Sequence, residues 1–416
     1  MGMTIAEKVL AAHAGRPAVR PGEYVWCKVD ATSGHMLRAL ERLGVERVWD
    51  PDRVYVVEDH LAPPPTVDAA NSATEMRRLV KKYGITNFFE FGRGGILHQL
   101  FPENGMIAPG ELIAMGDSHS TSGGVFNACV TNSAMDALYI LAFGELWFRV
   151  PESVKVVIDG NLPSWCVGKD VILEIARDLG TDFGLYKSIE YTGAAVRQMT
   201  IAQRWTIANM GVEVGAKFAL FECDEKTDEW LSTRVSRPYE PVFADRDAQY
   251  ETTHRFDVSG LEPMVAFPHD PGNVHPARTA QETGIPIDQA FLGSCTNARQ
   301  EDLEVAARVM KGRKVAPGVR MLVSPASQEV YRDALKAGWL EILADAGCLV
   351  EHSTCGPCFG GHLGVLGDGE VCISSSNRNF QGRMGSSQAQ VYLASPATVA
   401  ASAIAGRIVD PREFLA

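Results

Sequence analysis

Hydrophobic residues along the chain follow two periods in turn, and this alternation predicts a succession of strands and helices. Short continuous apolar runs are typical of buried strands, whereas apolar residues that recur every three to four positions indicate one face of a helix. The strands predicted in this way are residues 24–30, 53–57, 87–91, 111–115, 154–158, 287–292, 319–324 and 348–350. The predicted helices are residues 36–43, 69–83, 125–143, 169–179, 203–216, 300–311 and 327–337. Strands that alternate with helices throughout a chain are typical of α/β layers, so we predict the α/β fold class.

Local signals and length add to this pattern. Thr4 followed three residues later by Glu7 is typical of a capping box and predicts a helix that begins beside Thr4. Residues 222–285 are rich in Asp and Pro and weakly patterned, which predicts a linker zone. A chain of 416 residues is long enough for two to three domains.

Charge and composition exclude some classes of partner. The formal net charge is −12, and no run of basic residues interrupts the acidic balance. Nucleic acid and an anionic membrane surface are therefore not expected as partners, and an anionic substrate must be bound by a few local arginines. The start of the chain has no apolar signal segment, and the apolar stretch at residues 137–148 is interrupted by Gly144 and Glu145, well short of a membrane span. We expect a cytoplasmic protein.

Three of the nine cysteines lie in turns rather than in apolar segments. Cys295 stands in Gly-Ser-Cys-Thr-Asn, and Cys355 and Cys358 form a Cys-x-x-Cys pair in Thr-Cys-Gly-Pro-Cys. Three thiolates are one short of the four that complete most Fe–S or structural zinc sites, and the deficit leaves one metal corner free. The residues alone leave three alternatives open: an Fe–S cluster, zinc with His352 or His362 as a fourth ligand, and a redox dithiol. The other six cysteines are predicted to be buried and structural.

A set of acidic residues and histidines predicts acid–base chemistry. Asp59 and His60 follow a predicted strand and precede a proline-rich loop, and Asp117 and His119 follow another strand. Carboxyl ends of strands are where open α/β sheets carry their sites. His98 lies in a third loop. A lone histidine is usually structural, but a carboxylate beside an imidazole is typical of proton transfer.

Two further groups carry polar side chains, and the first of them predicts anion binding. Asn377, Arg378 and Arg383 lie in a loop rich in Gly and Asn, where arginines suit bidentate binding of carboxylates. Asn209 and Glu213 are four residues apart on a predicted helix and so share a face. In isolation, each arginine is equally compatible with a surface ion pair, and the Asn–Glu pair with an exposed helix face.

In this order, the motifs resemble those of the aconitase superfamily, and most closely the separate large subunits of its isopropylmalate and homoaconitate branch. The resemblance runs nearly end to end. Its blocks are Met3–Lys8, Asp59–His60, Gly95–Gly105, Pro109–Gly110, Gly116–His119, Trp147–Pro151, Lys169–Leu173, Asn209–Ala216, Gly293–Asn297, Thr354–Cys358 and Asn377–Gly385.

The resemblance implies an aconitase-like fold and a resident cofactor. The fold would have three α/β/α domains, at residues 1–154, 155–285 and 286–416, around a central cluster site. One [4Fe-4S] cluster per subunit would be held by Cys295, Cys355 and Cys358, and its fourth iron would be open to substrate as a Lewis acid. The implied reaction is reversible dehydration of a hydroxy-diacid.

The family's residue roles fall on matching positions of this sequence. The acid that protonates the departing hydroxyl falls on His60, supported by Asp59. The pocket and hydroxyl-orienting positions fall on His98, Asp117, His119 and Glu213. The substrate-binding positions fall on Ser118, Asn209, Asn377, Arg378 and Arg383.

The resemblance also implies a partner. In the family a serine on a swivelling fourth domain removes the carbon-bound proton, and only about thirty residues follow Arg383 here, too few for a domain of ordinary size. We therefore expect a separate small subunit that carries the general-base serine and reads the substrate's variable group. The chain alone is expected to be inactive as a dehydratase.

Two segments depart from the family pattern. Residues 30–35 are shortened, with His35 as a candidate replacement for a polar group, and residues 120–124 read Ser-Thr-Ser-Gly-Gly. Isopropylmalate is the leading candidate substrate, and homoaconitate and methyl- or dimethylmalate are alternatives in the same family. The alternatives of a different class are a non-catalytic cluster-dependent sensor and a zinc-bound structural protein.

Overall fold

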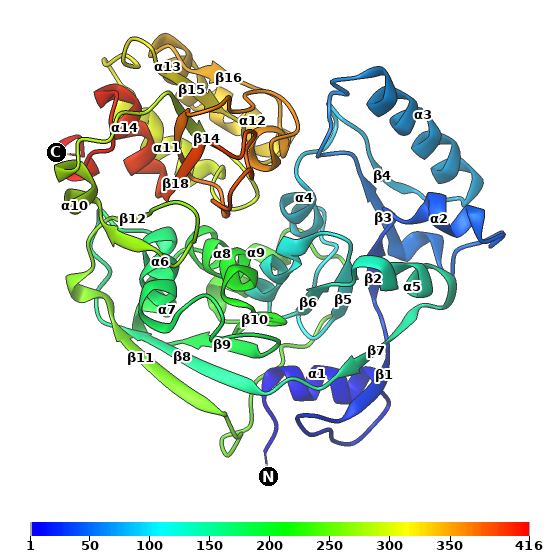
Figure 1. Ribbon diagram of the computed structural model, residues 1–416. Coiled ribbons are helices and arrows are strands. Elements are labelled where there is room, and N and C mark those ends of the chain that lie inside the picture. Colours follow the sequence, from blue (N-terminus) through cyan, green and yellow to red (C-terminus); the bar gives the residue numbers. More distant parts are fainter. Residues whose placement is uncertain (1, 416) are drawn as a thin grey trace.

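Two parallel sheets form the first two thirds of the computed structural model, which describes residues 2–415 (Figure 1). The first sheet has the order β4-β3-β2-β5-β6 and is parallel throughout. Its strands are β2 (Ala31–Ser33), β3 (Val54–Val57), β4 (Asn87–Phe89), β5 (Leu112–Met115) and β6 (Cys129–Asn132). The second sheet has the parallel order β10-β9-β8-β11. Its strands are β8 (Ser153–Asp159), β9 (Ser188–Thr192), β10 (Phe218–Phe221) and β11 (Thr252–Asp257).

A third, larger sheet follows, with the order β13-β12-β18-β17-β14-β15-β16. Its strands are β12 (Met264–Ala266), β13 (Val274–Pro276), β14 (Gln289–Leu292), β15 (Arg320–Val323), β16 (Leu349–Val350), β17 (Val371–Ser374) and β18 (Gln390–Ala394). Only the pairings of β12 are antiparallel among its ladders. A separate antiparallel ribbon pairs β1 (Tyr24–Lys28) with β7 (Glu145–Arg149).

Helices connect and flank these strands. In the described residues they are α1 (Ile5–His13), α2 (Leu37–Arg42), α3 (Val67–Lys82), α4 (Leu97–Glu103), α5 (Ala137–Phe143), α6 (Gly168–Leu179), α7 (Ala194–Gln198), α8 (Ile201–Asn209), α9 (Glu225–Ser232), α10 (Ala277–Glu282), α11 (Gln300–Met310), α12 (Gln328–Lys336), α13 (Trp339–Asp345) and α14 (Pro396–Ala405). The 3₁₀ helices are η1 (Pro51–Arg53), η2 (Ser118–Phe126), η3 (Ala134–Asp136), η4 (Met210–Val214), η5 (Val258–Gly260), η6 (Gly356–Phe359) and η7 (Pro411–Glu413). No helix within residues 2–415 combines the length and apolar character that a membrane crossing requires.

The α/β fold class is confirmed, as is the capping box of α1. The Thr4 hydroxyl accepts from the Glu7 amide and the Glu7 carboxylate accepts from the Thr4 amide, so both unpaired donors at the helix start are satisfied. The three domain boundaries stay a prediction.

The helix predicted at residues 125–143 is wrong. The segment ends one 3₁₀ helix at Phe126, forms strand β6 and only then enters α5. Asn127 adopts a left-handed conformation (φ 59°) that ends the helical turn, and the β-branched residues after it pair with β5. A continuous apolar run does not distinguish a helix from a buried strand by its period.

Two other boundaries need correction. The helix predicted at residues 203–216 ends as an α-helix at Asn209 and continues as the 3₁₀ helix η4 to Val214. The linker zone predicted at residues 222–285 is wrong, because β11 joins the second sheet and β12 and β13 join the third. The exposed, polar face of β11 conceals its strand period.

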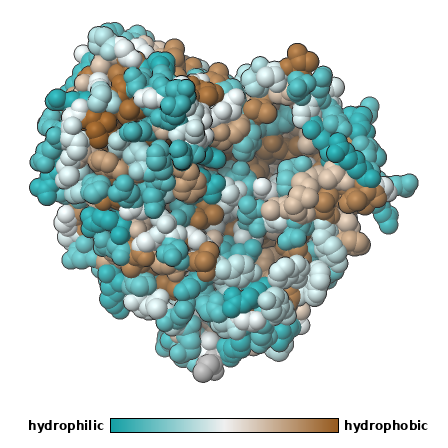
Figure 2. Space-filling view, viewed as in Figure 1, coloured by the Kyte–Doolittle hydropathy of each residue, from teal (hydrophilic) through white to brown (hydrophobic). Residues whose placement is uncertain are grey.

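One core joins the three regions. A cluster of buried apolar side chains runs from the first sheet through the second and into β17 and β18 of the third, while a second cluster packs the third sheet against its own helices. Figure 1 shows the first sheet on the right, the second at the lower left and the third at the upper left. Figure 2 shows the surface hollowed between the upper left and right parts.

Candidate active site

The carboxyl ends of β3 and β5 bring Asp59, His60 and Asp117 together, and helix α4 adds His98. His60 Nδ1 lies 2.7 Å from Asp59 Oδ1, and His60 Nε2 lies 3.4 Å from Asp117 Oδ2. His98, from α4, approaches Asp117 Oδ1 with its Nε2 at 2.6 Å. Asp117 is therefore the centre of the group, because imidazoles from two separate segments reach its two carboxylate oxygens.

The three predicted cysteines face the same place from the third sheet. A cavity of 70 Å³ is lined by all of the predicted site residues except Asn209, Glu213 and Arg378. The lining residues among the predictions are Asp59, His60, His98, Asp117, Ser118, His119, Cys295, Cys355, Cys358, Asn377 and Arg383. All three cysteines are free thiols. Segments more than two hundred residues apart thus meet at one small cavity.

The three remaining predicted residues stand directly behind this lining. Glu213 Oε1 lies 2.8 Å from His119 Nε2 and 2.7 Å from Arg378 Nε, and its side chain is 2% exposed. Arg378 also donates to the Ser118 hydroxyl at 2.9 Å. The Asn209 amide donates to Cys295 Sγ at 3.1 Å. The structure therefore brings all of the sequence-predicted site residues into one contiguous network.

The donors around the sulfur atoms fit a thiolate-bound metal or cluster. Asn209 and Asn377 both donate amide N–H groups toward Cys295 Sγ, at 3.1 and 3.5 Å, and an Arg383 guanidinium N–H approaches Cys358 Sγ at 3.8 Å. N–H donors and a cation stabilise thiolates and cluster sulfurs. Burial raises the pKa of the Cys295 thiol to about 12 and holds the pKa of the Cys355 thiol well above its usual range. Buried thiols of this kind become thiolates when a metal takes the place of the proton.

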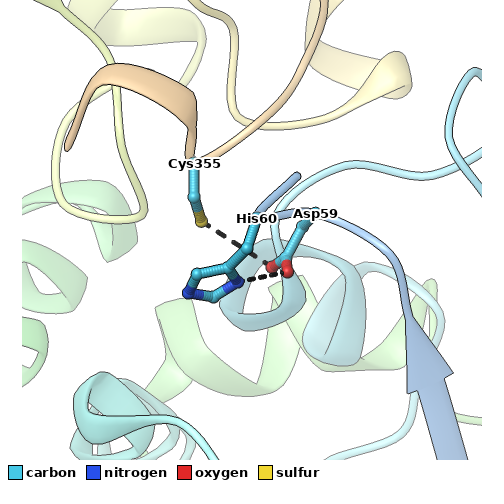
Figure 3. A group of neighbouring side chains, drawn as sticks. All are labelled: Asp59, His60 and Cys355. Atoms are coloured by element: carbon cyan, nitrogen blue, oxygen red, sulfur yellow. Dashed lines mark hydrogen bonds and ion pairs between the residues drawn. The ribbon is translucent and has the colours of Figure 1, made fainter. Parts of the chain in front are cut away.

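A second donor set overlaps the first. Asp59, His60 and Cys355 offer a carboxylate, an imidazole and a thiol whose ligand atoms lie within 4.8 Å of one another (Figure 3). The dashed lines in Figure 3 join Asp59 to His60 Nδ1 and to Cys355 Sγ, the latter at 3.8 Å. Asp59 Oδ2 also accepts from the Leu97 amide at 2.8 Å. Both Asp59 oxygens are thus already in use, and the cysteines are the more available ligands.

The surroundings of His60 and His119 shift the pKa values of these two histidines in opposite directions. The Asp59 carboxylate raises the pKa of His60 to about 9 against the opposing effect of burial, and Asp117 adds to the rise. Burial lowers the pKa of His119 below its ordinary value, although Glu213 opposes this. Burial would raise the pKa of Asp117, but His98, followed by His60 and His119, holds it well below its usual range. Of these two histidines, His60 is therefore the one whose protonated form the surrounding charges favour.

Backbone contacts fix His60 to the cysteine loop. The Asp59 carbonyl accepts from the Cys355 amide at 2.8 Å and from the Thr354 hydroxyl at 2.7 Å. His362 Nε2 lies 2.8 Å from the His60 carbonyl oxygen. The sequence offered His362 as a zinc ligand, but its Nε2 is engaged here in positioning the loop. No pattern in the sequence predicts that the Asp59–His60 segment contacts the Thr354–Cys358 loop, although each of the two segments is one of the family's motifs.

The altered segments occupy two different environments. His35 lines a neighbouring cavity of 350 Å³ together with Asp59, His60 and Asp117, and its ring fills the space beside Gly116, where a Cβ would lie 2.0 Å from a ring carbon. Residues 120–124 are all buried in η2. There Gly124 packs so tightly that a Cβ would lie 1.8 Å from the Ala219 carbonyl oxygen. Residues 30–35 therefore border the site, and residues 120–124 belong to the packing behind it.

Comparison with known proteins places this geometry in a family context. The profile of the "Aconitase family (aconitate hydratase)" matches residues 8–406. The "3-isopropylmalate dehydratase large subunit" of Aquifex aeolicus is 47% identical over 427 residues, covering 100% of this chain and 98% of that protein. The "3-isopropylmalate dehydratase large subunit 1" of Pyrococcus furiosus is 46% identical over 421 residues, covering 100% and 99%. The solved aconitase X of Thermococcus kodakaraensis aligns with a TM-score of 0.48 and 12% identity, over 85% of this chain and 84% of that one.

Proposed function

The chain belongs to the aconitase family, and from that premise we propose that it is the catalytic large subunit of a [4Fe-4S] hydro-lyase acting on 3-isopropylmalate. Relatives named 3-isopropylmalate dehydratase large subunit match the whole chain at 46–47% identity. The observation that carries the proposal is the convergence of three free cysteines and the Asp59–His60 pair on one cavity. This activity would place the protein in leucine biosynthesis.

Cys295, Cys355 and Cys358 would hold the cluster. When bound, it supplies a Lewis-acidic iron that weakens the carbon–oxygen bond of the substrate's hydroxyl group. The Asn209 and Asn377 amides and the Arg383 guanidinium support this assignment, because they direct N–H donors at the sulfur atoms. Zinc is less favoured as the bound metal. Among the described residues 2–415, the cavity lining does not include His352 or His362, the two candidates for a fourth zinc ligand.

His60 would donate its Nε2 proton to the departing hydroxyl. Its Nδ1 is held by Asp59 at 2.7 Å, and this contact orients the ring and keeps the proton available. Phe359 packs against the imidazole with ring centroids 5.1 Å apart and limits its rotation. Asp117, held by His98, would orient the hydroxyl before it leaves.

Arg378 and Arg383 would bind the substrate's carboxylates, with Asn377 and Ser118 completing the site. Arg378 is held by Glu213 and Ser118 at 2.7 and 2.9 Å, so its guanidinium is oriented before substrate arrives. Two arginines supply the local positive charge that a protein of net charge −12 needs in order to bind a dianion.

These relatives are named as large subunits, which supports a small-subunit partner. We assign to that partner the swivelling domain, the serine that removes the carbon-bound proton, and the recognition of the substrate's side group. Homoaconitate and methyl- or dimethylmalate are the alternative substrates of the same chemistry.

The test is the chain co-expressed with its small subunit and purified without oxygen. The proposal expects about four iron atoms and four sulfides per chain, with hydration of 2-isopropylmaleate by the pair and none by the chain alone. A cluster without hydration of any substituted maleate would indicate a sensor. Stoichiometric zinc in place of iron would refute the cluster assignment.

A further inference from the structure

Lys169, the second residue of α6, is buried, and no carboxylate of residues 2–415 forms a hydrogen bond with it. It is 0% exposed, and its Nζ donates to two main-chain carbonyls, those of Ser375 at 2.9 Å and Ser376. Burial lowers its pKa to about 7. A buried amine is costly unless its hydrogen bonds are made, and here all of the acceptors belong to one short segment of the third sheet.

That segment leads directly into the proposed substrate-binding loop. Ser375 and Ser376 follow β17, and Asn377 and Arg378 come next in the chain. With no residue between Ser376 and Asn377, the position of the Ser376 carbonyl fixes where the next two side chains begin. Lys169 thus reaches from a helix beside the second sheet to the start of a loop carried by the third.

The same segment also holds the turn that carries Cys295. The Ser375 hydroxyl shares its one proton between the Asn297 carbonyl at 3.0 Å and the Gly293 carbonyl at 3.3 Å, and it accepts from the Gly293 amide at 3.1 Å. The Asn377 side chain reaches Cys295 Sγ at 3.5 Å. The segment at 375–377 therefore has two attachments, one to the cysteine turn and one to Lys169.

The helix end that carries Lys169 is itself fixed. The Asp170 carboxylate accepts from the Val167 amide and from the Met264 amide of β12, both at 2.9 Å. One oxygen caps α6 and the other ties it to the third sheet. Because these contacts fix the start of α6, the long and flexible Lys169 side chain can hold the Ser375 and Ser376 carbonyls at a defined position.

We propose that Lys169 is a positioning residue that sets Asn377 and Arg378 at the substrate carboxylates through the Ser375 and Ser376 carbonyls. This inference rests on the proposed function, because it takes Asn377 and Arg378 as substrate binders. It predicts that loss of the lysine weakens binding of the dicarboxylate and leaves the attachment of the cysteine turn through Ser375 in place.

The experiment compares Lys169→Met and Lys169→Gln with wild type in the reconstituted complex. The glutamine variant keeps an N–H donor in place of the lysine amine, and it is the variant to be measured if Lys169→Met does not fold. Lys217→Met is the matched control, because burial also lowers the pKa of Lys217, to about 8, and its Nζ packs over Phe148 and Tyr186 instead. The probe is 2-isopropylsuccinate, which has both carboxylates but no hydroxyl to lose, and its binding is measured by calorimetry.

We expect the Lys169 variants to bind the probe about tenfold more weakly, a loss of the size expected when a hydrogen bond from a charged group is removed or weakened. KM should rise by a similar factor, iron content should match wild type, and hydrogen exchange should rise at residues 374–379. Lys217→Met should bind the probe as wild type does. Wild-type affinity and KM in a folded Lys169 variant, with only a lower melting temperature, would overturn the inference. A wild-type complex that neither binds the probe nor hydrates any substituted maleate would instead overturn the proposed function and the inference with it.

Discussion

Glu103, at the end of α4, links the helix that carries His98 to the third sheet, and its ionisation should set part of the pH dependence of stability. Its Oε1 accepts from the Gln99 side chain at 2.7 Å and from the Ser327 hydroxyl, at the start of α12, at 2.8 Å. Burial raises the pKa of Glu103 from 4.5 to about 7, and these two hydrogen bonds only partly offset that rise. The folded protein therefore binds a proton at Glu103 more tightly than the unfolded chain does.

The sign of the effect follows from that difference. Because the pKa is higher in the folded state, the contribution of Glu103 to stability is fully present below pH 4.5 and is lost as the pH rises through about 7. The difference between the two values corresponds to roughly 3 kcal/mol in total, of which about 2 kcal/mol falls between pH 5 and 8. Glu103→Gln keeps an Oε1 that can accept from both partners and removes the ionisation. The variant should therefore gain about 2 kcal/mol relative to wild type on going from pH 5 to pH 8.

The assay is urea unfolding of the chain at the two pH values, with Glu282→Gln, an exposed position on α10, as the control. The reasoning predicts that the difference in unfolding free energy between Glu103→Gln and wild type grows with pH and that the control's does not. An equal difference at pH 5 and pH 8 would show that Glu103 is already ionised in the folded protein at low pH, and it would refute the reasoning.

Three further predictions concern the site. Cys355→Ser should abolish iron binding on anaerobic reconstitution. The control Cys223→Ser changes a buried cysteine away from the cavity and should bind iron as wild type does. Equal loss of iron in both variants would contradict the assignment of Cys355 as a cluster ligand. Gly116→Ala should lower the unfolding free energy by about 1–3 kcal/mol, because its Cβ would overlap the His35 ring, and thermal melts should show the loss largely relieved in a His35→Ala background. Arg383→Lys should raise KM about tenfold with little change in iron content, since a lysine cannot reproduce a bidentate contact with a carboxylate, and unchanged KM would remove Arg383 from the substrate site.

Most elements could be predicted because their boundaries depend on local rules. The strand predicted at 319–324 is β15 at Arg320–Val323, and the helix at 327–337 is α12 at Gln328–Lys336, where Ser327 caps the first turn. The failure at 125–143 has the opposite cause. There a left-handed Asn127 and pairing with β5 divide one apolar run into four elements, η2, β6, η3 and α5, and both depend on tertiary contacts.

The candidate site could be predicted as a set of residues but not as a set of contacts. The Asp59–His60 and Asp117–His119 segments could be expected to meet, because both follow parallel strands of one sheet. The attachment of the Asp59 carbonyl to Thr354 and Cys355 could not, since it joins the first sheet to the third and no local pattern records it. The Lys169 contacts are hidden for the same reason.

If the three cysteines and the Asp59–His60 pair form one hydro-lyase site, removal of His60 should stop hydration without loss of iron. Iron content and hydration of 2-isopropylmaleate are measured together on anaerobically purified complexes of wild type and His60→Ala. We expect the same iron content in both complexes and a loss of hydration of about a hundredfold or more in His60→Ala, as is typical when a general acid is removed. Wild-type hydration by His60→Ala, or a wild-type complex that contains iron but is inactive, would contradict this expectation.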